Sequence, residues 1–150
     1  MLFSFLIGVF AGLRSLTAPA VTGWAIHLGR LRVDRPFSLL GSAPAVAILT
    51  VLAIGELVVD KLPNTPNRTA PTGLLARIVT GGVTGACVAA GAAQRPLIGA
   101  VLGALGGVVG CFGGYETRRR LVKALGTRDF NIALVEDLVA IAGSVSILFR

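Results

Sequence analysis

Long apolar stretches with few charges dominate this chain. Residues 37–55, 78–94 and 96–115 carry no charged side chain over 19, 17 and 20 positions. Residues 131–149, the last stretch, contain two acidic residues, and residues 2–29, the first stretch along the chain, are interrupted by Arg14. About 20 apolar residues in a helix span the hydrocarbon core of a bilayer. The pattern predicts an all-α membrane protein, a bundle of four to five transmembrane helices in a single domain.

The first apolar stretch is expected to be a broken helix. Arg14, Ser15 and Thr17 place a charge and two hydroxyls in mid-span, and Pro19 removes a backbone donor. A break at membrane depth is tolerated only where it faces protein or a water-filled cavity. Pro19 suits the first turn of a new half-helix, whose free N–H groups would suit an anion. Such broken helices recur in secondary transporters.

The remaining elements follow from charge and proline positions. Further helices are expected over about residues 38–60, 72–94, 96–115 and 131–149, with a short basic amphipathic piece before the last. Residues 62–71 hold three prolines and two asparagines, so an extended loop is expected there.

Four of the seven acidic residues lie in two of the apolar stretches. Glu56 and Asp60 are one turn apart and share a helix face, whereas Glu136 and Asp137 point about 100° apart, so at least one faces inward. A charged side chain inside a bilayer costs several kcal/mol unless it is paired or hydrated. Alternation of the spans brings all four to one half of the bundle. Three arginines are available as partners: Arg14, Arg68 and Arg77.

Three interpretations of the carboxylates stay open: a network of ion pairs that locks the bundle, a proton or cation relay, and a docking surface. The leading functional hypothesis is a small transporter or channel-like protein. Its carboxylates handle a proton or cation, and the break in the first helix contacts an anionic or polar solute. The alternative is a non-transporting scaffold or lipid-binding protein whose ion pairs are structural.

Glycines repeat every four residues along one helix and give it a smooth face for a neighbouring backbone. Either helices of one chain pack closely there, or two copies meet and form a homo-oligomer. These glycines are Gly99, Gly103, Gly106, Gly107, Gly110 and Gly114.

The net charge of +7 is better explained by membrane anchoring than by nucleic-acid binding, because no aromatic residues interleave with the basic ones. Anionic lipids are expected at four basic residues after the fourth span. With the amino terminus on the first side of the membrane, alternation puts eight basic residues on that side and five on the other. The first side is then cytoplasmic, although dual insertion stays open. The four lipid-contacting residues are Arg118, Arg119, Arg120 and Lys123.

Catalytic and metal-binding patterns are not found in the sequence. His27 is the single histidine, so no Ser-His-Asp set or metal cluster can be assembled, and no cofactor is expected. Cys87 and Cys111 lie in consecutive helices at depths that differ by about 12 Å. A disulfide between them is not expected, and the protein is not expected to be an enzyme.

Four segments resemble an uncharacterised family of small bacterial integral membrane proteins. They are AGLRSLTAP at residues 11–19, ELVVDKLPNTPNR at 56–68, GYETRR at 114–119 and VED at 135–137. The resemblance covers nearly the whole chain. It implies a multi-pass protein of the bacterial inner membrane, and it brings no assigned activity.

Overall fold

The computed structural model is a helical bundle, and it describes residues 1–60, 70–126 and 129–149. No strand occurs in these ranges, so the all-α prediction is confirmed. The elements are α1 (Leu2–Leu13), α2 (Thr17–His27), a short 3-10 helix η1 (Phe37–Gly41), α3 (Ala43–Val59), α4 (Pro71–Gly91), α5 (Pro96–Leu125) and α6 (Asp129–Leu148).

Three of these helices are long and apolar enough to cross a membrane. They are α4, α5 and α6, with 21, 30 and 20 residues. Helix α3 is shorter, at 17 residues, but only Val46 and Ala53 of it are buried, so its outer face suits lipid. These spans, with no strand in the described residues, confirm an all-α membrane protein.

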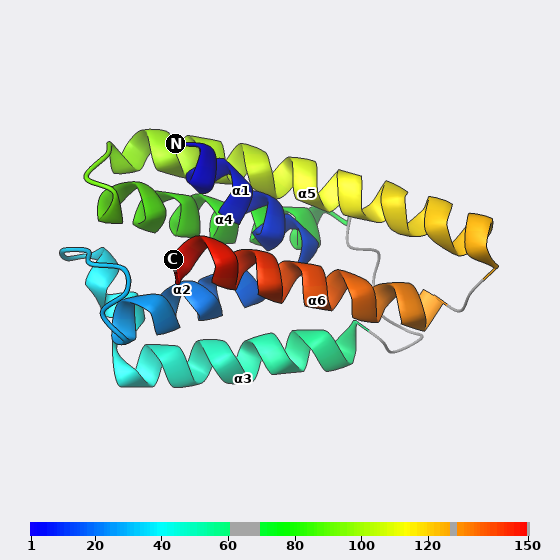
Figure 1. Ribbon diagram of the computed structural model, residues 1–150, viewed down its shortest axis with the longest axis horizontal. Helices are drawn as coiled ribbons and strands as arrows, with labels where there is room; N and C mark the ends of the chain where they lie inside the picture. Colours follow the sequence, from blue (N-terminus) through cyan, green and yellow to red (C-terminus); the bar gives the residue numbers. More distant parts are fainter. Residues whose placement is uncertain (61–69, 127–128, 150) are drawn as a thin grey trace.

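The first apolar stretch breaks where the sequence predicts, but the chain then turns back on itself. Helix α1 leads away from the end of the bundle that holds both termini, and α2 returns to it (Figure 1). The amino group of Met1 donates to Gln94 Oε1 at 2.7 Å, and His27 lines a cavity with the same Gln94. With 12 and 11 residues, the two helices reach only about 18 Å and 16 Å. They form a re-entrant hairpin, not one interrupted span.

This hairpin corrects the expected side of the amino terminus. Met1 lies at the end of the bundle that holds Arg30, Arg32, Arg35 and Arg95, not at the end that holds Arg118 (Figure 1). The alternation argument counted residues 2–29 as one crossing, whereas the hairpin enters and leaves at the same end. Arg32 and Arg35 line the cavity at the end that holds Met1, whereas Arg118 lies near the opposite end of α5.

Glycine contacts hold α5 between α1 and α4. A Cβ on Gly103 would lie within 3.0 Å of Gly81 O and Gly85 Cα, and a Cβ on Gly8 would meet Gly103 itself. Gly99 and Gly107 also face α4, while Gly106 and Gly110 face α1. Gly114 is half-buried. The repeat therefore serves close packing within one chain.

Three further expectations concern the basic piece, the cysteines and the proline-rich loop. The basic piece after residue 115 is not a separate element, because α5 continues without interruption to Leu125, and Gly126 ends it in the left-handed conformation. Cys87 and Cys111 are both buried, and no disulfide joins them to each other in the described residues. Of the proline-rich loop, residues 61–69 lie outside the described residues, and Pro71 already begins α4.

Candidate functional site

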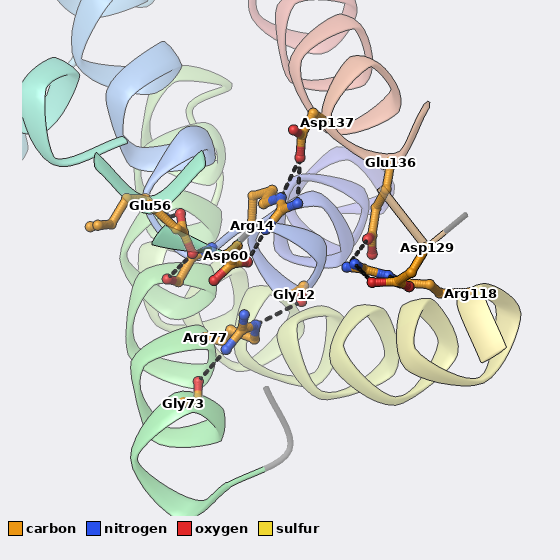
Figure 2. Close-up of polar contacts among 12 residues, drawn as sticks. Gly12, Arg14, Glu56, Asp60, Gly73, Arg77, Arg118, Asp129, Glu136 and Asp137 are labelled. Atoms are coloured by element: carbon orange, nitrogen blue, oxygen red, sulfur yellow. Dashed lines mark hydrogen bonds and ion pairs between the residues drawn. The ribbon is translucent and has the colours of Figure 1, made fainter. Parts of the chain in front are cut away.

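The tip of the hairpin carries an arginine that is completely buried. Arg14 follows the last residue of α1, has an extended backbone and exposes 0% of its surface. Its guanidinium lies between two carboxylates from different helices (Figure 2). Nε and Nη2 both lie 2.5 Å from Asp137 Oδ1 on α6, and Nη1 pairs with Asp60 Oδ2 at the end of α3. We call these three residues the Arg14 cluster.

The start of α2 is capped by a carboxylate from α3. Glu56 Oε1 accepts hydrogen bonds from Ser15 N at 2.8 Å and from Ser15 Oγ at 2.6 Å, and Glu56 Oε2 accepts one from Leu16 N at 2.8 Å. The amino-terminal end of a helix carries partial positive charge, so a carboxylate is stabilised there. The anion expected at this break is therefore supplied by the protein itself.

A positively charged side chain, Arg77, lies at the carboxyl-terminal end of α1. Arg77 of α4 is buried and donates from Nε to Gly12 O at 3.0 Å, and from Nη1 to Gly73 O at 2.9 Å. Carbonyl groups at the carboxyl-terminal end of a helix lack partners within the helix, and a cation is favoured there. The two ends that meet at the break are thus satisfied by charged side chains from α3 and α4.

Glu136 belongs to a different cluster from its neighbour Asp137. Arg118 of α5 pairs with Asp129 through two hydrogen bonds of 2.7 and 2.5 Å, and its Nη1 lies 3.6 Å from Glu136 Oε2 (Figure 2). Arg118, Asp129 and Glu136 form what we call the Arg118 cluster. It joins the far ends of α5 and α6, whereas Asp137, one position further along, turns toward the hairpin.

The other predicted site residues are placed as follows. Thr17 opens α2 and is buried, and its hydroxyl has no hydrogen-bond partner in the described part of the chain. Arg68 lies outside the described residues. The structure therefore brings Arg14, Asp60 and Asp137 together, sets Glu56 beside them on Ser15, and separates Glu136. Within residues 1–60, 70–126 and 129–149, no group of three His, Cys, Asp or Glu side chains could hold a metal ion.

Two features of the site were missed by sequence reasoning. Arg77 was expected to serve the carboxylates, and its bonds to the carbonyls of Gly12 and Gly73 depend on tertiary packing that has no local signal. Asp129 was not singled out. Its place at the start of an apolar stretch, where an acidic residue suits the first turn of a helix, was the available signal.

A family profile described as a domain of unknown function (DUF4126) matches residues 1–150. The chain belongs to this family. The match covers every element that builds the two clusters and confirms the resemblance to an uncharacterised family. Comparisons with curated proteins and with solved structures gave no match. Because DUF4126 carries no described activity, the function has to be argued from the geometry of the chain.

Proposed function

We propose that the protein is a small membrane transporter or channel-like protein in which the Arg14 cluster handles a proton or a cation. The observation that carries the proposal is the complete burial of Arg14 at a backbone break, between carboxylates of α3 and α6. Ionisable side chains at this depth are costly and usually mark a pathway for ions or solutes. Half-helices that end inside the bundle provide such sites in known transporter folds.

The arrangement couples ion binding to helix position. Arg14 has one positive charge, and it pairs with both Asp60 and Asp137. A proton or cation that neutralises one aspartate removes its attraction for Arg14. The Arg14 guanidinium would then be paired with only one of the two helix ends, that of α3 or that of α6. A ligand shifts such an equilibrium by its preference for one arrangement over the other.

The proposed solute is an anionic or polar molecule that competes with Glu56. The donors at Ser15 and Leu16 suit a carboxylate or phosphate, and Glu56 occupies them at 2.6–2.8 Å. A solute of this class would replace the Glu56 carboxylate at the start of α2. Release of Glu56 would leave Asp60 as the remaining polar link described between α3 and the hairpin, so solute binding and the charge state of Asp60 would act on the same contact.

The second candidate function is a non-transporting membrane scaffold or lipid-binding protein. It is favoured by the saturation of the site: Asp60, Asp137 and Glu56 all have partners in the same chain. Under this hypothesis the charges lock the hairpin into the bundle and move nothing.

The two functions are separated by Asp137→Asn in proteoliposomes. The amide keeps the shape of the side chain but cannot carry its charge. For a transporter we expect loss of pH- or cation-dependent flux with the bundle still folded. Asp129→Asn is the matched control, because Asp129 pairs with the outer Arg118 and is 64% exposed.

The flux and the free energy of unfolding of Asp137→Asn together distinguish the two hypotheses. A decrease of about 3–5 kcal/mol in the free energy of unfolding, with no separate defect in flux, would support the scaffold, because Arg14 would have lost a buried counter-charge. Normal flux with normal stability would exclude Asp137 from either role. Fluorescent-dye flux assays and unfolding of the detergent-solubilised protein provide the two measurements.

The setting of this function is also a proposal. We infer a multi-pass protein of the bacterial inner membrane without enzymatic activity, in contact with anionic lipids at Arg118, Arg119, Arg120 and Lys123. The homo-oligomer stays a prediction. Since the glycine face of α5 contacts α1 and α4, copies would have to meet through other apolar faces, such as the exposed side of α3.

A further inference from the structure

A cavity of about 820 Å³ opens at the end of the bundle opposite the Arg118 cluster. Its walls come from the segment between α2 and α3 and from the turn between α4 and α5. Gln94 and Pro96 line it, and Pro96 is where the charge-free stretch of α5 begins. The cavity therefore lies where an apolar span ends, at the depth of the lipid headgroups.

The lining is apolar on one part and positively charged on another. Ile26, Leu31 and Phe37 supply apolar surface, and Arg32 and Arg35 supply two positive charges against the single negative charge of Asp34. This combination matches a molecule with an acyl part and an anionic head. Arginine is well suited to the head, because its planar donors match the geometry of phosphate oxygens.

Both arginines are available to a ligand. Arg32 and Arg35 are exposed, and neither makes a hydrogen bond or an ion pair with the residues that the structure describes. The basic residues at the opposite end differ. Arg118 is paired with Asp129, and both Arg119 and Arg120 are paired with Glu116. The charges of Arg32 and Arg35 are therefore not neutralised by a neighbouring carboxylate in an ion pair, and they can attract an external anion more strongly.

We propose that this cavity binds the headgroup of an anionic phospholipid, with Arg32 and Arg35 on its phosphate and Phe37 and Leu31 beside the start of its acyl chains. The volume is in the range of sites for drug-sized ligands, about 300–1,000 Å³, and far exceeds the needs of one phosphate ion. Basic pockets among membrane helices are known to bind such headgroups. The site is independent of the proposed transport function.

The chain carries its own reporter for this site. Trp24 is the single tryptophan and is 41% exposed. Its ring lies edge-on to that of His27 with centroids 5.8 Å apart, and His27 lines the cavity, where its Nδ1 is within 2.8 Å of Gly41 O. Lipid in the cavity is therefore close enough to affect Trp24 fluorescence.

The test measures quenching of Trp24 by brominated phospholipid in proteoliposomes of phosphatidylcholine. Brominated phosphatidylglycerol and brominated phosphatidylcholine are compared at the same low mole fraction. We expect stronger quenching by phosphatidylglycerol, and an apparent affinity that falls roughly fivefold for each arginine removed in R32Q/R35Q. R119Q/R120Q is the matched control, because it removes the same charge at the other end and should leave the preference unchanged.

Three results would overturn the proposal. Equal quenching by the two lipids in the unmodified protein would show that the cavity does not select an anionic headgroup. An unchanged preference in R32Q/R35Q, with an unchanged melting temperature, would assign the preference to other residues. A loss of the preference in R119Q/R120Q as large as that in R32Q/R35Q would show that overall positive charge, and not the cavity, sets the preference. A loss of flux has no bearing on any of these readings.

Discussion

Arg14 and Arg118 each hold two carboxylates, but in opposite surroundings. Arg14 is fully buried and joins residues 46 and 123 positions away, Asp60 and Asp137. Arg118 is partly exposed, and its main partner, Asp129, is 64% exposed and only 11 positions away. The inner cluster unites three parts of the fold, whereas the outer one joins two consecutive helices. The same ion-pair chemistry therefore has different energetic weight at the two sites.

Removal of the inner arginine should have the largest effect. Arg14→Gln removes the buried guanidinium that lies between Asp137 and the partly buried Asp60, and we expect a loss of about 3–5 kcal/mol in the free energy of unfolding. Denaturant unfolding in detergent micelles provides the measurement. A loss no larger than that of Arg118→Gln would show that Arg14 is hydrated, and the contrast between the clusters would disappear.

A glycine substitution asks whether packing also holds the hairpin. Gly103→Leu would force a side chain against the backbone of Gly81 and Gly85 in α4 and so displace α5, on which Gly8 of α1 packs; it should cost about 1–3 kcal/mol. Gly113→Leu is the control, because a Cβ at Gly113 meets nothing within 4 Å. Thermal unfolding and size in detergent report the effect. Equal behaviour of the two variants would mean that charge alone positions α1.

The outer cluster should contribute less. Arg118→Gln removes a pair whose partner is largely solvent-exposed, so we expect about 1 kcal/mol or less. The loss should shrink further at high salt, because exposed ion pairs are screened. Melting temperatures at low and high ionic strength test this. Salt-independent destabilisation would place the Arg118 cluster in the same class as the inner one.

The smallest effect is expected at the surface of α5. Arg120 is 77% exposed and pairs with Glu116, which also contacts Arg119. Arg120→Gln should therefore leave the melting temperature unchanged, since Glu116 keeps a partner one turn away. A clear decrease in the melting temperature would reveal a contact of Arg120 beyond this pair.

The long helices could be predicted because hydropathy reports burial in lipid directly. The helices predicted over about residues 72–94, 96–115 and 131–149 correspond to α4, to the first part of α5 and to α6. The break near Arg14 was readable from its charge and from Pro19. The reversal of the chain there was not, since an interrupted span and a returning hairpin share the same pattern of apolar residues. What distinguishes them is tertiary contact, such as that between Met1 and Gln94.

The candidate site was predicted in part for the same reason. Charges in apolar stretches pointed to Arg14, Glu56, Asp60 and Asp137, and the structure gathers these four at the hairpin. The partner of Glu136 could not be assigned, because one residue of rotation decides which neighbour a side chain faces. The capping of α2 by Glu56 also depends on the depth of the hairpin, which no local pattern encodes.

The hairpin has a consequence for the synthesis and membrane insertion of the protein. A ribosome completes Arg14 before it reaches either carboxylate partner, because Asp60 follows 46 residues later and Asp137 follows 123 residues later. Helices of 12 and 11 residues are too short to be retained in a bilayer as spans of their own. We therefore expect the amino-terminal segment to reach its final depth only after α6, which carries Asp137, has been synthesised.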